Sequence, residues 1–501
     1  MSTTLDARAI ESRHDDAISE ATDGLQIDHW VGGERAGSGG DDRFETIDPA
    51  VGSPITDVAR GGATEIDAAV EAARAAYDDH WRETTPFERA DVVRDWVDEL
   101  RDHSDELARL ESLDTGKPIQ FARDEIEDAF DYFEYYVSVA QDHTGKQLPR
   151  GPDGHYYTRS EPYGVAGQIL PWNYPLNLFG WKVGAALAAG NTAVVKPSEE
   201  APLSITRAAQ LSEGILPDGV LNVVNGYGDA AGAPLAEHDG VDKLSFTGSV
   251  PVGRAVMHAA ADHVTPVTLE LGGKSPFVVF EDADLTAAAR SVAAGIFYNT
   301  GQSCDACSRV LVQEAVHDEF MDEFLSAVEF WQPGDPLAGD VNMGPLTFEA
   351  QLAKVEEYVG IGTADGAELV AGGERIESGG GFYYEPTVFD DVDNGARIAQ
   401  EEIFGPVECV ITFSEYEEAI SLANDVEYGL AAGVATTDAS RAHRAAADIL
   451  AGSVWINQYH GGGPGVPFGG YKASGFGREC AAETLDEYTH SKAVGMQLEE
   501  R

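Results

Sequence analysis

The sequence predicts an α/β protein built around parallel sheets and divided into two or three domains. Short apolar segments alternate with turns rich in Gly, Pro and Ser and then with helical patterns, as at Thr192-Ala-Val-Val195, Leu221-Asn-Val-Val224 and Asp242-Lys-Leu-Ser-Phe246. Alternation of this kind is typical of parallel sheets. The length of 501 residues fits two to three domains at about 150 residues each. A hydrophobic content of 43% is ample for a large core.

The first part of the chain reads as a polar lead-in followed by helices. Residues 1–25 are acidic and show no apolar period, so we expect them to be disordered. Order should begin near Ile27. Thr64 is a candidate N-cap for a helix, and a second helix should follow Pro86. The Gly-Lys-Pro within residues 114–118 should end the helical run.

Two later segments complete the expected organisation. Residues 145–162 are rich in Gly, Pro and aromatic residues and read as an extended excursion. A second α/β unit should run from about Pro276 to about Gly475. We find no internal repeat, and the only low-complexity block is Gly461-Gly-Gly-Pro-Gly465.

The charge of the chain is extreme. It has 87 acidic and 33 basic residues, for a net charge of −54. Carboxylates spread over a surface keep a protein soluble in strong salt, where their mutual repulsion is screened, so we expect a halophilic source. The same charge excludes the basic footprint of a nucleic-acid-binding protein.

The four cysteines are too few for a disulfide framework in so long a chain. The N-terminus has no basic region followed by an apolar core, and no apolar run approaches the ~20 residues of a membrane span. We therefore expect a cytoplasmic protein. HExxH is absent and the histidines are scattered, so no metal is predicted. Gly273-Lys-Ser275 lacks the earlier Gly of a phosphate-binding loop, because Thr268 stands there.

The stretch Asn299 to Arg309 carries the candidate nucleophile, Cys304. Gly301 and small polar residues indicate a tight loop. A loop thiol near backbone amides can be held as thiolate and attack a carbonyl carbon. The alternative for a free cysteine is a small buried apolar residue.

Three further stretches accompany this loop. Leu170-Pro-Trp-Asn-Tyr-Pro175 contains Asn173, Leu269-Glu-Leu-Gly-Gly-Lys-Ser275 contains Glu270, and Glu401-Glu-Ile-Phe-Gly-Pro406 contains Glu402 and Phe404. In this order and at these separations, the four motifs resemble the NAD(P)-dependent aldehyde dehydrogenase superfamily from about Ile27 to about Lys492.

The resemblance implies a particular division of the chain. It predicts a Rossmann-like NAD-binding domain from residues 26–144 and 163–275, and a catalytic α/β domain from residues 276–475. Residues 145–162 and 476–501 would form a small β oligomerisation arm, giving a homodimer or homotetramer.

The cofactor residues come from the same resemblance. It assigns Lys196 and Glu199 to the adenosine ribose, Ser249 to the pyrophosphate and Glu402 to the nicotinamide ribose. Further cofactor-binding candidates are Trp172, Gly228, Gly232, Phe246 and Phe404. Because the Glu199 carboxylate would accept ribose hydroxyls but repel a 2′-phosphate, we predict NAD rather than NADP.

The implied chemistry uses four residues. Cys304 would attack an aldehyde, Asn173 would hold the oxyanion, and Glu270 would activate the water that releases a carboxylic acid. Lys182 would tune the local proton path. The strand pattern places Glu270 on the face opposite Val267, Leu269 and Leu271.

The substrate is open among several classes. Tyr174, Trp181, Tyr298 and Tyr459 should line a tunnel, either for varied apolar aldehydes or, through cation–π attraction, for betaine aldehyde. A semialdehyde dehydrogenase would need an anchoring cation, for which Arg309 is the candidate.

Two residues beside the nucleophile carry further hypotheses. Asp305 would raise the thiol pKa if its charge pointed inward. Cys307 completes a CxxC with Cys304, which suggests a reversible disulfide. Read alone, it also leaves open a thiol-redox or non-catalytic NAD-binding protein.

Overall fold

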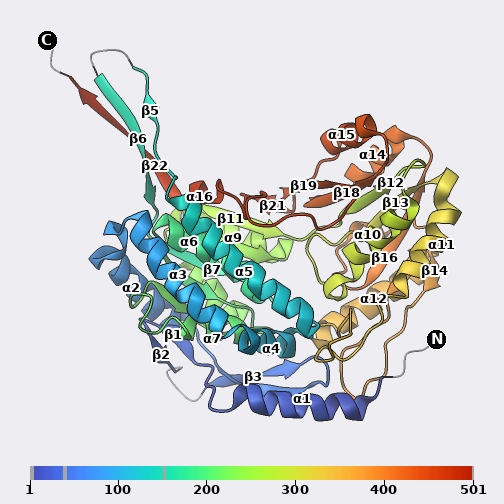
Figure 1. Cartoon of the computed structure of the whole chain (residues 1–501), viewed down its shortest axis with the longest axis horizontal. Helices are drawn as coiled ribbons and strands as arrows, with labels where there is room; N and C mark the ends of the chain where they lie inside the picture. The colour runs from blue at the N-terminus through green and yellow to red at the C-terminus, as the bar shows by residue number, and fades with distance from the viewer. Residues whose placement is uncertain (1–4, 38–41, 151–153, 499–501) are drawn as a thin grey trace.

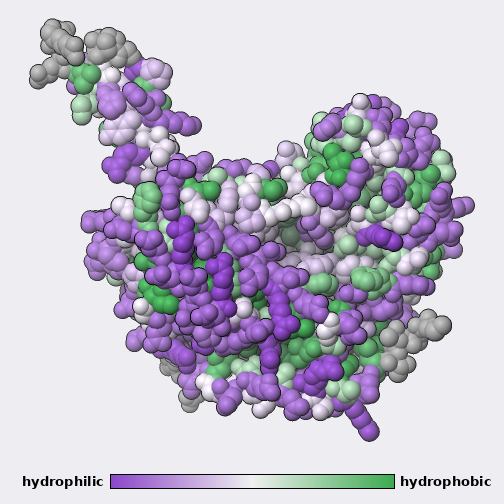
Figure 2. All heavy atoms as spheres, viewed as in Figure 1, coloured by the Kyte–Doolittle hydropathy of each residue, from purple (hydrophilic) through white to green (hydrophobic). Residues whose placement is uncertain are grey.

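The computed structural model describes residues 5–37, 42–150 and 154–498. Two lobes, each built on its own sheet, lie side by side, and a narrow β arm projects from the first lobe (Figure 1). The face drawn in Figure 2 is mostly hydrophilic, as the composition predicts. No helix in the described part of the chain is long and apolar enough to cross a membrane.

The first lobe contains an eight-stranded sheet in the order β2-β1-β9-β8-β7-β10-β11-β21. Its five central strands are parallel, and its outer strands pair antiparallel. The strands are β1 (His29–Val31), β2 (Glu34–Ala36), β7 (Val165–Ile169), β8 (Thr192–Lys196), β9 (Leu221–Val223), β10 (Lys243–Gly248), β11 (Val267–Leu271) and β21 (Gly475–Phe476). The three strands expected near residues 192, 221 and 242 are confirmed.

Helices cover the first sheet. They are α2 (Ala63–Asp79), α3 (Pro86–Asp102), α4 (Ser104–Thr115), α5 (Ile119–Ala140), α6 (Pro175–Ala189), α7 (Leu203–Gln210), α8 (Ala233–Glu237) and α9 (Val250–His263), with short turns η1 (Trp81–Glu83) and η2 (Gly228–Gly232). Helix α3 begins at Pro86 as predicted. Helix α2 begins before Thr64: its N-cap is Gly62, because Glu65 reaches back to accept the Gly62 N–H at 2.8 Å.

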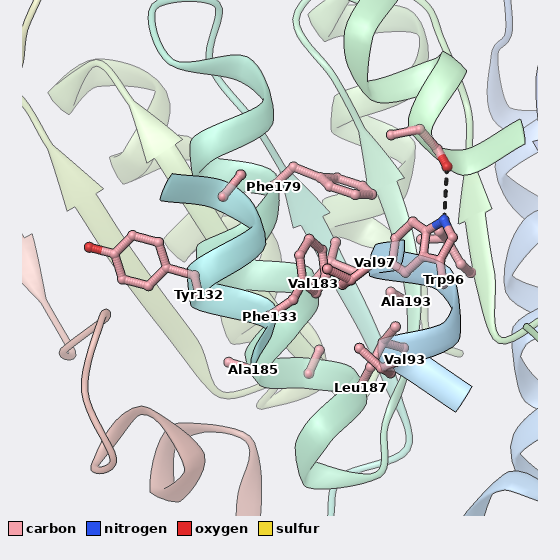
Figure 3. Packing of buried hydrophobic residues seen from close by; sticks show 14 of the residues in the cluster. Val93, Trp96, Val97, Tyr132, Phe133, Phe179, Val183, Ala185, Leu187 and Ala193 are labelled. Atoms are coloured by element: carbon pink, nitrogen blue, oxygen red, sulfur yellow. Dashed lines mark hydrogen bonds between the residues drawn. The ribbon is translucent and has the colours of Figure 1, made fainter. Parts of the chain in front are cut away.

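The largest core cluster of this lobe is packed between α3, α5, α6 and the sheet (Figure 3). Trp96 is fully buried, and its ring meets Phe133 and Phe179 edge-on at centroid distances of 5.1 and 6.1 Å. Its indole N–H donates to the Ala208 carbonyl at 3.1 Å, so the ring is buried without leaving a polar atom unpaired. This packing fixes α6, which follows the loop that carries Asn173.

The second lobe contains a seven-stranded sheet in the order β14-β15-β16-β13-β12-β18-β19, parallel except for β14. Its strands are β12 (Pro276–Val279), β13 (Arg309–Gln313), β14 (Glu368–Ala371), β15 (Thr387–Asp390), β16 (Val407–Phe413), β18 (Ala431–Ala435) and β19 (Ser453–Ile456). Its helices are α10 (Leu285–Phe297), α11 (His317–Val328), α12 (Glu349–Asp365), α13 (Arg397–Gln400), α14 (Tyr416–Asn424) and α15 (Ala439–Asp448), with turns η3 (Tyr298–Gly301) and η4 (Glu314–Val316).

The projecting arm is a three-stranded sheet in the order β22-β6-β5. Strands β5 (Gln147–Leu148) and β6 (Gly154–Pro162) belong to the excursion predicted at residues 145–162, and β22 (Thr489–Gln497) pairs antiparallel along the whole of β6. Helix α16 (Thr484–Glu487) leads into β22, and the remaining short pairings are β3 (Arg43–Asp48) with β4 (Ser53–Ala59) and β17 (Tyr428–Gly429) with β20 (Tyr471–Lys472).

Two expectations about the ends of the chain are wrong. The lead-in is not disordered over its described part, because α1 (Ala7–Thr22) lies beneath β3 (Figure 1). Its buried stripe begins with Ile10 and His14, so a polar residue occupies a core position and hides the apolar period. Strand β21, divided in our expectation between the catalytic domain and the arm, pairs instead with β11 at the edge of the first sheet.

Candidate functional site

The Cys304 loop is held by close backbone contacts. Asn299, Thr300 and Gly301 all have positive φ (49°, 58° and 73°). A Cβ at Gly301 would lie 2.1 Å from the Gly405 carbonyl oxygen, and one at Gly273 would lie 2.3 Å from the Cys304 carbonyl oxygen. Glycine at both positions therefore lets the loop press against its two neighbours. Cys304 stays partly exposed, whereas the other three cysteines are buried.

Asn173 lies against the same loop. It follows β7, and its side-chain amide donates to the Gln302 carbonyl at 3.0 Å. Asn299 returns a hydrogen bond from its own amide to the Asn173 carbonyl at 3.0 Å. Asn173 is 4% exposed. The two asparagines therefore hold the turn before α6 against the loop before Cys304. The Asn173 amide donates to Gln302, two residues before the thiol.

Glu270 is a buried carboxyl without a hydrogen bond. It lies on β11 opposite the apolar face, as the strand pattern predicts, but the face it occupies is buried as well. Neither of its oxygens has a partner among the described residues. Burial raises the pKa of Glu270 well above its usual value, and the nearby Glu479 raises it further, against the opposing charges of Lys182 and Arg478.

The ammonium group of Lys182 lies in a buried polar cluster beside Glu270. It donates to Glu479 at 2.5 Å and to the Ser245 hydroxyl at 2.9 Å. Lys182 and Glu479 are at most 2% exposed. Sequence reasoning missed Glu479, because it follows Arg478 in a stretch with several other charged residues and nothing local marks it as buried.

The electrostatics of the resting thiol oppose its ionisation. Burial raises the pKa of Cys304 well above its usual value, and the carboxylates of Asp305, Glu270 and Glu402 raise it further. The charge of Asp305 thus acts in the predicted direction. Attack by this thiol would require its proton to leave as a carbonyl or cofactor enters. The loop thiol, the Asn173 amide and the Glu270 carboxyl together make a candidate nucleophilic site.

The dinucleotide candidates surround the ends of the first sheet. Lys196 ends β8 and pairs with Glu199 at 2.6 Å, and the Gly228 N–H donates to Glu199 at 3.4 Å. A Cβ at Gly228 would meet no atom within 4 Å, and one at Gly232 would meet only Lys196, at 3.9 Å. Ser249 occupies the N-cap position of α9, but its hydroxyl makes no capping bond. These strand ends therefore have open space, a Ser249 hydroxyl that makes no capping bond, and a helix N-terminus, which suit a pyrophosphate and ribose.

The residues expected at the nicotinamide end lie across the site. A Glu402 oxygen accepts the Gly273 N–H at 2.9 Å. The rings of Trp172 and Phe404 meet edge-on at 5.2 Å, and Phe404 adopts a positive φ of 63°. Phe246 differs from the rest, because it is 4% exposed and its ring packs in the core of the first lobe; its contact with a cofactor stays a prediction.

The four tunnel candidates fall into separate groups. Tyr174 shares a hydrogen bond with the Ser303 hydroxyl at 2.7 Å. Trp181 packs against Tyr132 and Phe468, two rings that the sequence did not single out. The other two candidates pack elsewhere: Tyr298 against Phe121 and His460, and Tyr459 against Phe277 and Trp455 with its hydroxyl on the Asp305 carbonyl at 2.5 Å.

Arg309 cannot anchor an anionic substrate. It is fully buried, and its guanidinium donates to the Lys274, Leu422 and Ala423 carbonyls and to Asn394. All three guanidinium nitrogens already donate to protein groups, so the prediction that Arg309 anchors a semialdehyde is wrong. Cys307 is also buried, with its thiol on the Val292 carbonyl; its disulfide with Cys304 stays a prediction. The described residues contain no cluster of three or more His, Cys, Asp or Glu suited to a metal ion.

Known proteins share both the sequence and the fold. Residues 36–494 match the model of the aldehyde dehydrogenase family. An aldehyde dehydrogenase from Emericella nidulans is 42% identical over 457 residues, covering 91% of this chain and 92% of that protein. A Bacillus cereus aldehyde dehydrogenase solved as its NAD+ complex has a TM-score of 0.94 and 42% identity, covering 96% of this chain and 98% of that one.

A betaine aldehyde dehydrogenase from Staphylococcus aureus, solved with NAD+, also has a TM-score of 0.94, at 37% identity, and the match covers 96% of this chain and 97% of that one. The chain therefore belongs to the aldehyde dehydrogenase family.

Proposed function

We propose that this protein oxidises aldehydes to carboxylic acids with NAD, through a covalent intermediate on Cys304. The observation that carries the proposal is the meeting of three groups from three segments. The Cys304 loop is joined to Asn173 by hydrogen bonds, and Glu270 lies near enough to act on the thiol electrostatically. Membership of the aldehyde dehydrogenase family supports the same reaction.

The first half of the reaction is acylation of Cys304. The partly exposed thiol releases its proton to solvent and its sulfur attacks the aldehyde carbon, so that the carbonyl oxygen becomes an oxyanion. The Asn173 amide and the Cys304 backbone N–H donate to that oxygen, where buried donors stabilise the new charge strongly. Bound NAD supplies the hydride acceptor. Loss of the hydride leaves a thioester on Cys304.

The second half is hydrolysis of the thioester. Glu270 takes a proton from a water molecule as the water oxygen attacks the acyl carbon, and the C–S bond breaks, so that the acid is released and Cys304 is left as thiolate. A carboxyl with a raised pKa is a stronger base than an ordinary glutamate once ionised, which suits this step. Lys182, paired with Glu479, lowers the cost of the Glu270 charge and lies on the route by which the proton can depart.

The cofactor preference rests on Glu199. Its carboxylate is already oriented by Lys196 and the Gly228 N–H at the open edge of the first sheet. A ribose can donate two hydroxyls to such a carboxylate, but a 2′-phosphate would be repelled. We therefore expect kcat/KM to favour NAD over NADP, and a clear NADP preference would contradict this assignment.

The substrate we favour is a broad range of apolar aldehydes, received by the aromatic residues around the thiol. Tyr174 contacts the Cys304 loop through Ser303, and Trp181 and Phe468 pack against each other to offer further apolar faces. Betaine aldehyde remains the alternative, because aromatic rings also attract a trimethylammonium group. Initial rates with betaine aldehyde and with neutral aldehydes of similar size separate the two.

Three properties of the whole protein belong to the proposal. The net charge of −54 supports a halophilic source, which a fully active enzyme without added salt would contradict. The projecting arm supports a homodimer or homotetramer, to be measured by light scattering in salt. We also propose a cytoplasmic location.

The decisive test is a matched pair of cysteine variants. Cys304→Ala should abolish NADH formation from any aldehyde while leaving NAD binding intact. Cys409→Ala removes a buried thiol in the core of the second lobe and should retain turnover per folded molecule. Turnover that survives Cys304→Ala would refute the nucleophile, and the thiol-redox alternative would gain weight if the parent enzyme oxidised no aldehyde.

A further inference from the structure

The residue directly after the candidate nucleophile is a carboxylate that the proposed reaction does not use. The Asp305 side chain is 14% exposed. Burial raises the pKa of Cys304, and the charge of Asp305 raises that pKa further. A negative charge next to a sulfur that must become negative opposes the reaction. The structure must either tolerate this cost or reduce it.

A basic side chain faces Asp305. The His460 Nε2 atom lies 3.5 Å from the Asp305 carboxylate, and the imidazole is 27% exposed. The pKa of Asp305 is raised by burial, but opposing contributions from His460 and Ser303 leave it below its usual value. Glu270 and Glu402, the other carboxylates that act on Cys304, feel nearby lysine or arginine charges, but neither forms an ion pair with a described residue, and Glu402 accepts the Gly273 N–H.

The loop that carries His460 holds Asp305 at two points. Tyr459 donates its hydroxyl to the Asp305 carbonyl at 2.5 Å, while His460 faces the carboxylate. His460 has a positive φ of 55°, although it is not glycine, so its surroundings fix it in an uncommon conformation. Its ring lies among Trp455 at 6.1 Å, Tyr459 at 4.9 Å and Tyr298 at 6.1 Å.

We propose that His460 is a positioning residue for the proposed dehydrogenase reaction: its imidazole holds the Asp305 carboxylate at Nε2 and so sets how strongly that charge acts on the Cys304 thiol. The inference rests on the proposed function, because it concerns the same thiol. It ties the glycine-rich segment 458–467 to the nucleophile. Since the His460 ring also contacts Tyr298, an aldehyde that displaced Tyr298 would change the reactivity of Cys304.

A test must distinguish the effect of His460 from that of the other titratable groups near Asp305 and Cys304. Glu270, Glu402 and Asp305 act on Cys304, and Tyr174 and Tyr459 lie within reach of the Asp305 charge. Both tyrosines have a pKa well above the usual value because of burial, so they stay neutral over the range of interest. Any effect of His460 on the Cys304 thiol must therefore disappear when Asp305 loses its charge.

The test is the pH dependence of Cys304 alkylation in the free enzyme. Iodoacetamide should react at Cys304, which is partly exposed, in preference to the three buried thiols, and mass spectrometry of peptides verifies the site. In His460→Gln, the pH midpoint of alkylation should rise by up to about one unit, because the Asp305 carboxylate loses the ring that holds it. Asp305→Asn should lower the midpoint, and the double variant should behave like Asp305→Asn.

His443→Gln is the matched control, because His443 is an exposed histidine on α15 and should leave the midpoint unchanged. An unshifted midpoint in His460→Gln, or an equal shift in the Asp305→Asn background, would overturn the inference. Should His460→Gln unfold, His460→Asn takes its place and is read in the same way, alone and in the Asp305→Asn background. Alkylation needs neither aldehyde nor NAD, so this result is readable even if the proposed reaction fails.

Discussion

Two buried groups of charged residues in this molecule differ in how completely their members are paired. One lies beneath the candidate site, where Glu270 has no hydrogen bond to any described residue and Lys182 pairs with Glu479 instead. The other lies under α1, where His14 stands between Asp48 and Asp335. The His14 Nδ1 atom is 2.5 Å from Asp48 and Nε2 is 3.0 Å from Asp335, so both ring nitrogens are paired.

The group under α1 joins the two lobes. Asp48 ends β3 beside the first lobe, whereas Asp335 follows α11 of the second. Ile10, one turn before His14, packs in one buried cluster with Ala50 and Tyr383. A fully paired buried charge fixes one arrangement, whereas an unpaired carboxyl stores electrostatic energy that a reaction can use. The unpaired Glu270 thus suits a chemical role, whereas the fully paired His14 suits a structural one.

The sharpest way to break this distinction is Glu270→Gln. The amide keeps the shape but cannot act as a base, so thioester hydrolysis should slow by roughly 10²–10⁴-fold. The single-turnover burst of NADH should survive, because acylation precedes the lost step. Stability should not fall, since the amide removes a charge that faces Glu479. Stopped-flow absorbance and urea unfolding, both in fixed salt, measure the two effects; loss of the burst would refute the role of Glu270.

The counterpart under α1 is His14→Ala. It leaves Asp48 buried without a cation and Asp335 with only the half-exposed Arg13, which should destabilise the docking of α1 by about 3–5 kcal/mol. The value of kcat/KM per folded molecule should be unchanged. Limited proteolysis within residues 7–22 reports the release of α1. His258→Ala, which removes an exposed histidine on α9, is the control. Equal protection of α1 in both variants would count against a structural role for His14.

The pH dependence of α1 docking sharpens the contrast further. Burial lowers the pKa of His14, but the hydrogen bonds to Asp335 and Asp48 outweigh it and raise the pKa from 6.5 to about 9. This stabilisation is fully present below the unfolded pKa of 6.5 and is lost as the pH rises through about 9. The shift corresponds to about 3 kcal/mol. Protection of α1 should therefore fall between pH 6.5 and 9 in the parent but not in His14→Ala, and parallel profiles would refute the assignment.

The sequence predicts the regular parts of this molecule better than its polar interior. Strands β8 to β10 and the start of α3 follow from apolar patterns and turn residues, which act locally. Helix α1 is missed because its core position is held by His14, whose partners lie 34 and 321 residues away. Glu479 and the misassigned Arg309 fail for the same reason: pairing across the fold decides whether a charge is buried, and no local pattern records it.

The smallest expected effect isolates burial as the cause of the difference. Arg13 also pairs with Asp335, but its side chain is 49% exposed. Water competes for an exposed guanidinium and salt screens it, so Arg13→Ala should change α1 docking by less than about 1 kcal/mol. The same proteolysis assay compares it with His14→Ala against one carboxylate. If both variants release α1 equally, then proximity to Asp335 matters and burial does not, and the rule that separates the two groups of charges would not hold.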